Sequence, residues 1–251
     1  VAAVAAEAGA MVLARQQEGF ERWEKAAGEP VCQVDLDADR LIRDRLSAID
    51  PEAGWLSEET RDSPERLTRA RLWVVDPIDG TRDYLRGRTG WAVSIALVAD
   101  GQPVIGVLAA PGRGEHWRAE AGKGAWRNGV PIRAAARAEL AGARVPADSL
   151  PRVDRDLVAV AKPNSIALRV AMVAAGEADL VASVRWGHEW DVAAAALIAA
   201  EAGAAVSDAL GRPLRFNSMA GEMFGVLASA PGIHAAALDR LRARAEAAHP
   251  R

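Results

Sequence analysis

The chain has 251 residues, which suits one large domain or two small ones that share a core. It is 50% hydrophobic and 26% charged, the usual balance of a globular protein, so the composition excludes a disordered chain. Its formal net charge of −3, from 31 basic and 34 acidic residues, supplies no global basic field and argues against nucleic acid as a partner.

Soft metal ligands are scarce in the sequence. Cys32 is the only cysteine, which excludes an internal disulfide and a cysteine-based zinc site. The four histidines are scattered along the chain, which argues against a histidine-rich metal site. Any metal would therefore be held by carboxylates.

Membrane and targeting signals are absent from the sequence as given. The longest apolar run, Val192 to Ala200, is flanked by acids and falls well short of the roughly 20 residues that a spanning helix needs. The N-terminal segment has no basic leader and contains Glu7, so we expect no signal peptide. The chain starts without Met, which leaves room for a few missing residues. We expect a cytoplasmic protein with no membrane partner.

The first half of the chain predicts two helices followed by a meander of strands. Apolar residues at helical spacing predict helices over 1–19 and 35–49, with a polar loop around 28–30 between them. Bulky and β-branched runs predict strands over 54–57, 71–75, 91–99, 103–110, 115–120 and 125–132. Asp100-Gly101 and Asn128-Gly129 are tight-turn signals. This order is typical of an α+β layer.

After Arg133 the pattern changes to strands that alternate with helices, an α/β arrangement. The predicted strands are 157–161, 180–184 and 223–229, and the predicted helices are 165–175, 191–202 and 233–248. An Ala-, Arg- and Pro-rich stretch over 134–152 is the expected junction. We therefore divide the chain into an N-terminal α+β half, 1–133, and a smaller C-terminal α/β half, 134–251.

The strongest chemical signal is the run DPIDGT over residues 76–81, which follows a buried apolar strand. Proline fixes one backbone angle of the turn, and glycine lets the chain approach a ligand closely. Two carboxylates and a carbonyl at a strand end suit a hard divalent cation. If a helix begins at Thr81, the amides of Gly80 and Thr81 offer a seat for phosphate. From the residues alone, a capped turn with two solvated acids explains the run equally well.

Three separated motifs together resemble the inositol monophosphatase superfamily of magnesium-dependent, lithium-sensitive phosphatases. They are DPIDGT, the preceding pair Glu58-Glu59, and the distant run WDVAA over 190–194. The resemblance extends from about Lys25 to Phe216. It implies a layered αβαβα sugar-phosphatase-type fold, in which N-terminal helices and an antiparallel sheet precede the smaller C-terminal half. It also implies a small phosphate ester as substrate, two or three Mg²⁺ ions, and a homodimer as one assembly.

The resemblance assigns the metal ligands by position. Glu58, Asp76 and the Ile78 carbonyl would hold a first magnesium, and Asp76, Asp79 and Asp191 would hold a second. Such a pair of ions suits a displacement in which one activates water and the other stabilises the leaving oxygen.

The resemblance also assigns catalytic and substrate groups. Asp35 would pair with the Thr81 hydroxyl to activate the attacking water, and the amides of Gly80 and Thr81 would hold the phosphate. The residues implied to contact substrate are Glu58, Asp79, Gly80, Thr81 and Asp191.

Five further residues have both a functional and a plain structural interpretation. Glu59 would support the ligands or be a solvated neighbour, and Asp39 is expected at the surface. Lys25 resembles the lysine of the family's mobile loop, although a solvated helix end explains it nearly as well. We expect His188 to form local hydrogen bonds and Trp186 to lie in the core or to line the pocket.

Two positions depart from the family pattern. Cys32 stands where threonine is usual, and Asn164-Ser165 stands where a Gly-Ser or Gly-Thr pair is usual. Neither position is a metal ligand, so the departures put substrate fit in doubt rather than catalysis.

The runs LSEE over 56–59 and DGTRDY over 79–84 look most like the bisphosphate nucleotidase branch, which removes the 3'-phosphate of adenosine 3',5'-bisphosphate. Its second phosphate needs cationic partners. The candidates, for which a solvated basic face is the alternative, are Arg82, Arg86, Arg88 and Arg185.

Three other functions remain open on the sequence. Inositol monophosphate is the second substrate candidate and histidinol phosphate the third. A catalytically silent protein that binds a macromolecular partner is the alternative of a different class. The presence of all five candidate carboxylates, Asp35, Glu58, Asp76, Asp79 and Asp191, argues against it.

Overall fold

The computed structural model describes residues 1–18, 22–26 and 29–249. Seven strands form its largest sheet, in the order β3-β4-β5-β6-β7-β8-β9. They are β3 (Gly54–Ser57), β4 (Arg71–Asp79), β5 (Ala92–Ala99), β6 (Gln102–Ala110), β7 (Glu115–Glu120), β8 (Gly124–Arg127) and β9 (Val130–Pro131). β3 and β4 pair in parallel, and every other neighbouring pair is antiparallel.

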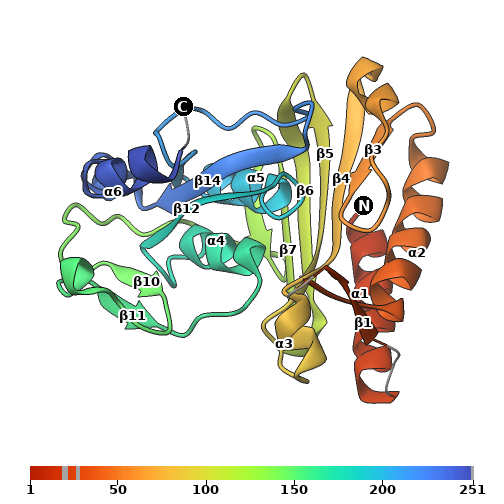
Figure 1. Cartoon of the computed structure of the whole chain (residues 1–251), viewed down its shortest axis with the longest axis horizontal. Helices are drawn as coiled ribbons and strands as arrows, with labels where there is room; N and C mark the ends of the chain where they lie inside the picture. Colours follow the sequence, from red (N-terminus) through yellow and green to blue (C-terminus); the bar gives the residue numbers. More distant parts are fainter. Residues whose placement is uncertain (19–21, 27–28, 250–251) are drawn as a thin grey trace.

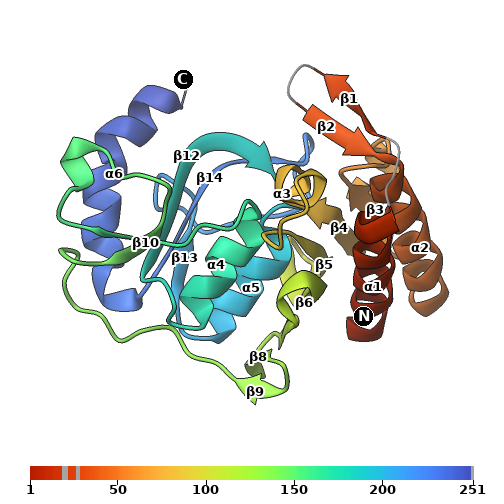
Figure 2. The ribbon, with the colours of Figure 1, turned by 90° about the horizontal axis from the view of Figure 1, so that it is seen from below.

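Helices cover both faces of this sheet (Figure 1). On one face lie α1 (Ala2–Glu18) and α2 (Gln33–Ile49), whose apolar side chains pack on Trp73 and Val75 of β4. On the other face lies α5 (Ala193–Glu201), with α4 (Ile166–Ala174) beside it. Figure 2 shows α4 and α5 side by side. Because α5 consists mostly of alanine, its backbone can approach the sheet closely.

A smaller antiparallel sheet lies beyond α4 and α5 and completes five layers. Its order is β12-β14-β13, formed by β12 (Leu180–His188), β14 (Glu222–Ser229) and β13 (Ala205–Ser207). Helix α6 (His234–Ala248) covers its outer side (Figure 1). The parallel pair β10 (Arg144–Pro146) and β11 (Val158–Val160) lies next to β12. The expected αβαβα layering is confirmed.

Short elements connect these layers. The hairpin of β1 (Arg22–Ala26) and β2 (Glu29–Cys32) joins α1 to α2, and α3 (Thr81–Leu85) follows β4. Four 3₁₀ turns cover Pro64–Thr68, Pro111–Arg113, Arg152–Asp154 and Pro231–Ile233. Within the described residues, no helix is long and apolar enough to span a membrane.

The structure confirms the five predicted long helices and the main strands, and it corrects four details. Glu29 and Pro30 belong to β2 rather than to a loop, while the Gly28 of that predicted loop lies outside the described residues. β4 does not end at Val75 but continues to Asp79, because an irregularity in its pairing with β5 accommodates Pro77. β10 and β13 were not predicted, since three residues each are too few to show a pattern. The strand predicted over 180–184 continues to His188.

Candidate active site

The end of β4 brings two buried acids together within a short turn. Asp76 and Asp79 are 1% and 6% exposed, and the Ile78 amide donates to Asp76 Oδ1 at 2.9 Å. Gly80 follows with a φ of +97°, where a side chain would be strained. A Cβ at Gly80 would also lie 2.8 Å from the backbone nitrogen of Ser165. The glycine therefore permits close packing of the turn against the segment before α4.

Asp191 reaches the same place from the C-terminal half of the chain. Carboxylate oxygens of Asp76, Asp79 and Asp191 all lie within 4.8 Å of one another, although Asp191 follows Asp79 by 112 positions in the sequence. Asp191 does not cap α5, because the N-cap residue of that helix is Val192. Its Oδ2 instead accepts a long bond of 3.4 Å from the backbone amide of His188. The carboxylate of Asp191 therefore approaches the two acids of β4 rather than capping α5.

The N-terminal end of α4 fixes the orientation of Asp79. The hydroxyl of Ser165 donates to Asp79 Oδ2 at 2.5 Å, and the amide of Ala167 donates to the same oxygen at 2.7 Å. The amide of Ile166 donates to Oδ1 at 3.3 Å. Ser165 also accepts from Leu168 as the N-cap of α4. Sequence reasoning missed this role of Ser165, although the Ser that precedes a helical pattern was a visible capping signal.

Burial and mutual repulsion shape the electrostatics of the acids. Burial raises the pKa of Asp76 well above its usual range, and the charges of Glu58, Asp79, Asp191 and Asp35 raise it further. Burial raises the pKa of Asp191 to about 7, with the Asp79 charge adding to the rise. The pKa of Asp79 is also raised by burial, although its hydrogen bonds to α4 oppose the rise.

These acids fit a divalent cation. The donor set consists of carboxylate oxygens, which hard ions such as Mg²⁺ prefer. Burial and mutual repulsion raise the pKa values of Asp76 and Asp191, so their ionised forms are disfavoured without a partner of opposite charge. A bound cation would supply that charge. The other four predicted carboxylates all lie within electrostatic reach of Asp76.

The remaining predicted groups lie around the cluster. Asp35 is buried near the start of α2, and Glu58 is exposed directly after β3. The Thr81 hydroxyl donates to the Ile78 carbonyl at 3.0 Å. Because a hydroxyl has one proton to donate, the pairing of Thr81 with Asp35 requires this hydroxyl to rotate. That pairing stays a prediction.

Asp39 is not a surface residue. It is 6% exposed, and its carboxylate accepts hydrogen bonds from the hydroxyls of Ser57 and Thr60. It therefore connects α2 to the end of β3, next to Glu58. The helical spacing from Asp35 showed its position on α2 but not the two hydroxyls that face it.

The remaining candidate residues of the sequence differ in burial and in their contacts. Trp186 and His188 both line a cavity of about 500 Å³ together with Asp191. The His188 ring stacks on Trp190 with centroids 4.2 Å apart, so the local hydrogen bond of His188 is made by its backbone. Glu59 is partly buried. The side chains of Lys25 and Cys32 lie outside the described part of the structure, so those two predictions stay open.

Cationic side chains face the cavity beside Asp191. Those that line it are Lys162, Arg169 and Arg185. The predicted anion-binding group Arg82, Arg86 and Arg88 is exposed, and none of the three lines the described cavities next to Asp191. Of the candidate arginines, Arg185 is therefore the one that the structure places at the cavity.

The amino-acid sequence of the chain is similar to those of several phosphatases. The chain matches the model of the inositol monophosphatase family over residues 1–248. It is 37% identical to an inositol-1-monophosphatase of Mycobacterium leprae, over 95% of this chain and 91% of that protein. It is 34% identical to a histidinol-phosphatase of Chlorobaculum parvum, over 78% and 79%. It is 33% identical to the 3'(2'),5'-bisphosphate nucleotidase CysQ of Escherichia coli, over 77% and 82%.

Solved structures of the same fold agree with the sequence relatives. The Thermotoga maritima IMPase superposes with a TM-score of 0.85 at 27% identity, over 99% of this chain and 97% of that one. The extragenic suppressor protein SuhB of Bartonella henselae superposes with a TM-score of 0.83 at 28% identity, over 96% of both chains. The chain belongs to the inositol monophosphatase family, whose members are metal-dependent phosphatases that hydrolyse small phosphate monoesters.

Proposed function

We propose that this protein is a magnesium-dependent phosphatase that hydrolyses a small phosphorylated metabolite, with adenosine 3',5'-bisphosphate as the preferred substrate. One observation carries the proposal. Three carboxylates from two distant parts of the chain lie within 4.8 Å of one another beside a cavity that cationic side chains line. Carboxylates suit the metal, and the cations suit an anionic substrate.

The proposed metal ligands are Glu58, Asp76, Asp79, Asp191 and the Ile78 carbonyl. When bound, the metal would supply Lewis acidity at the phosphate and at the attacking water. Asp79 is oriented by Ser165 and α4 before any ligand arrives, so its geometry costs little reorganisation on binding.

The protein's own groups would then position and deprotonate water. We assign Asp35 and the Thr81 hydroxyl to the water that attacks phosphorus, with one water proton passing to this pair as the new P–O bond forms. The ester P–O bond breaks, the departing alkoxide takes a proton from solvent, and the pair returns its proton to solvent. The amides of Gly80 and Thr81 would donate to phosphate oxygens, whose negative charge they stabilise.

Adenosine 3',5'-bisphosphate is favoured by charge. It carries a second phosphate, for which Lys162, Arg169 and Arg185 are cationic partners in the cavity that contains Asp191. The second candidate is inositol 1-phosphate, which is supported by the Mycobacterium leprae relative with its high coverage of the chain. Histidinol phosphate is the third.

Phosphate release with Mg²⁺ tests these candidates directly. Adenosine 3',5'-bisphosphate, inositol 1-phosphate and histidinol phosphate should be compared by kcat/KM, with fructose 1,6-bisphosphate as a second bisphosphate. We expect the nucleotide to have the highest value, and lithium to inhibit the reaction. A clear preference for inositol 1-phosphate or histidinol phosphate would overturn the substrate assignment. No release from any of the four would favour a catalytically silent, partner-binding protein.

A further inference from the structure

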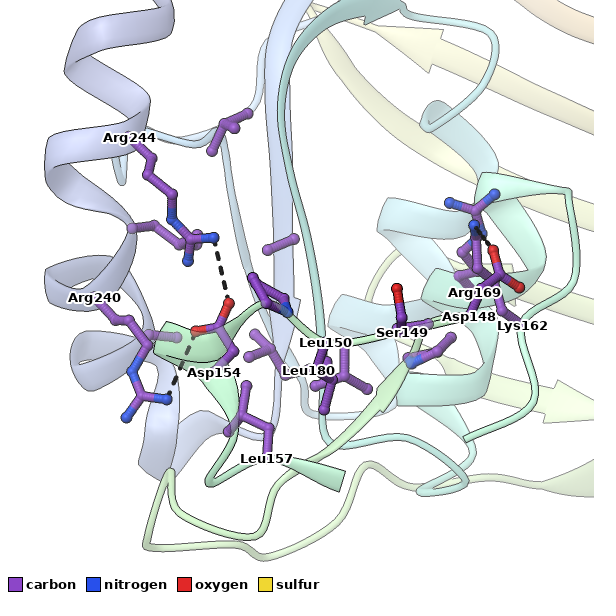
Figure 3. Close-up of a pocket in the computed structure, with 18 of the residues that line it drawn as sticks. Asp148, Ser149, Leu150, Asp154, Leu157, Lys162, Arg169, Leu180, Arg240 and Arg244 are labelled. Carbon is purple, nitrogen blue, oxygen red and sulfur yellow. Dashed lines mark hydrogen bonds and ion pairs between the residues drawn. The ribbon is translucent and has the colours of Figure 1, made fainter. Parts of the chain in front are cut away.

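A second cavity of about 500 Å³ lies away from the carboxylate cluster, between β10, β12 and α6 (Figure 3). Part of its wall is apolar, formed by Leu150, Leu157, Leu180 and Leu241. Leu150 and Leu157 belong to the segment that leads from β10 to β11, and Leu241 belongs to α6. The apolar wall can therefore receive a carbon skeleton.

Positive charge dominates the lining of this distal cavity. Five basic side chains line it, against the two acids Asp148 and Asp154. The basic residues are Lys162, Arg169, Arg185, Arg240 and Arg244. The excess of cations is local, because the whole chain has a net charge of −3. An anion is the ligand that such a lining would attract.

Two arginines of the lining are available to a ligand. Arg185 is exposed and forms no ion pair or hydrogen bond within the described residues. Arg244 contacts Asp154 through Nη1 at 3.3 Å, and its side chain remains 42% exposed (Figure 3). Arg240 also approaches Asp154 at 3.8 Å, so this acid keeps a cationic neighbour when Arg244 turns to an anion.

The distal cavity adjoins the cavity that contains Asp191. Both are lined by Lys162, Arg169, Ala182, Val184 and Arg185. A molecule in the distal cavity would therefore contact side chains that also face the proposed catalytic cavity.

We propose that the distal cavity is a binding site for a small organic anion with an apolar body. Its acidic group binds to Arg185 and Arg244, and its carbon skeleton packs on the leucines. Such an anion is either the far end of an extended substrate or a separate small molecule. The chemistry is the same in both cases, and kinetics distinguish them.

The first experiment measures binding without the catalytic metal. In EDTA the carboxylate cluster repels anions, which disfavours binding of a probe next to Asp191, and the variants described below locate the bound probe. The probe is 8-anilinonaphthalene-1-sulfonate, an aromatic anion whose fluorescence rises in apolar surroundings, and inorganic phosphate is the competitor that lacks an apolar body. We expect saturable binding of the dye to the folded protein and much weaker competition by phosphate.

Two pairs of variants place the dye in the cavity. Ser149 is exposed at the cavity and forms no described hydrogen bond, so Ser149→Glu adds a negative charge while Ser149→Gln adds the same bulk without charge. Arg244→Ala removes a cation, and Arg242→Ala removes a neighbouring one that pairs with Asp239 outside the cavity. Ser149→Glu and Arg244→Ala should each weaken binding about tenfold relative to their controls. If Arg244→Ala fails to melt cooperatively, the Ser149 pair decides the result.

The second experiment identifies the source of the anion and uses the phosphatase reaction with Mg²⁺. If the site holds the far end of the substrate, Ser149→Glu should raise the KM for adenosine 3',5'-bisphosphate relative to Ser149→Gln but leave the KM for glycerol 1-phosphate unchanged. If it holds a separate molecule, Ser149→Glu should leave both KM values at those of Ser149→Gln, because Ser149 lines the distal cavity and not the cavity that contains Asp191. Absence of phosphate release from both substrates counts against the proposed function and leaves the binding result intact. The proposal of a distal site is overturned if the dye does not bind, or if Ser149→Glu and Arg244→Ala bind it as well as their controls do.

Discussion

Asp191 is the residue on which a shared site between the two halves of the chain depends. Asp191→Asn keeps the shape of the side chain and removes one charge from a cluster in which charges repel. We expect the metal-free melting temperature to stay constant or rise. Activity should fall sharply, and the magnesium concentration needed for half-maximal activity should increase. Thermal melting in EDTA and a magnesium titration of phosphate release measure both effects.

An ordinary structural role for Asp191 would give the opposite pattern. A variant that melts at a lower temperature but retains near-wild-type activity at limiting magnesium would remove Asp191 from the metal site. The shared active site would then lose its main support.

Thr81 provides the test of the proposed water-positioning pair. Its hydroxyl donates to the Ile78 carbonyl, so Thr81→Ala removes that bond as well as the predicted contact with Asp35. We expect kcat to fall by roughly 10²–10⁴-fold, the usual contribution of a positioned acid–base group. The magnesium dependence should change much less, and Thr81→Ser should restore most of the rate. An unchanged kcat in Thr81→Ala would exclude this role.

Ser165 couples the stability of α4 to the position of Asp79. Ser165→Ala removes both the N-cap acceptor for Leu168 and the donor to Asp79. Loss of the cap should cost about 1 kcal/mol, or roughly 2–4 °C in melting temperature. Loss of the donor should also weaken magnesium activation, which capping alone would not change. Ser165→Thr retains the hydroxyl and serves as the matched control. Equal magnesium dependence in both variants would limit Ser165 to capping.

At the scale of elements, the approach of α5 to β6 places Asp191 opposite β4. Gly106 of β6 lies so close to α5 that an added Cβ would be 2.6 Å from the Ala194 carbonyl oxygen. Gly106→Ala must therefore move backbone and should destabilise the fold by about 1–3 kcal/mol. Because α5 begins two residues after Asp191, activity should fall as well. Thermal melting measures the loss of stability, and phosphate release measures the loss of activity.

Gly9 in α1 is the matched control for this substitution. A Cβ there would contact Ala109 and Pro111 at 3.4 Å, which is ordinary packing, and alanine is the better helix former. Gly9→Ala should therefore not lower the melting temperature. If Gly106→Ala behaves like Gly9→Ala, the close approach does not determine the position of α5.

Much of the architecture could be predicted because its patterns are local. The spacing of apolar residues in α2 and the Asn128-Gly129 turn, whose φ angles are +51° and +78°, express preferences that neighbouring residues determine alone. The antiparallel pairing of β12 with β14 could not be predicted, because pairing partners are chosen by tertiary packing. The burial of Asp39 was missed for the same reason, since Ser57 and Thr60 reach it from another element.

At the scale of the whole molecule, stability should depend on pH through the carboxylate cluster. Asp191 has a pKa of about 7 in the folded state, against about 3.9 in an unfolded chain. The folded protein therefore holds a proton that the unfolded chain has released between these values. The resulting stabilisation is fully present below about pH 4 and is lost as pH rises to about 7.

Two other titratable groups affect the same measurement in different ways. Burial would raise the pKa of Asp179, but hydrogen bonds and charge from Arg144 lower it overall, so its effect falls below about pH 4 and outside the window. Burial lowers the pKa of His234, so protonation of His234 favours the unfolded chain as pH falls below about 6.5. His234 thus opposes Asp191 within the window. Its contribution is the same in wild type and in Asp191→Asn, and it cancels in their difference.

We therefore expect the metal-free melting temperature of wild type, relative to that of Asp191→Asn, to fall as pH rises from about 5 to 8. Magnesium should reverse this trend, because it binds the ionised carboxylates and stabilises the folded state more at the higher pH. The experiment compares melting curves of both proteins at each pH, in EDTA and in excess Mg²⁺. The variant should show a smaller magnesium shift throughout. If the difference between the proteins is independent of pH, Asp191 does not titrate with the cluster. If magnesium stabilises both proteins equally, Asp191 does not bind the cation.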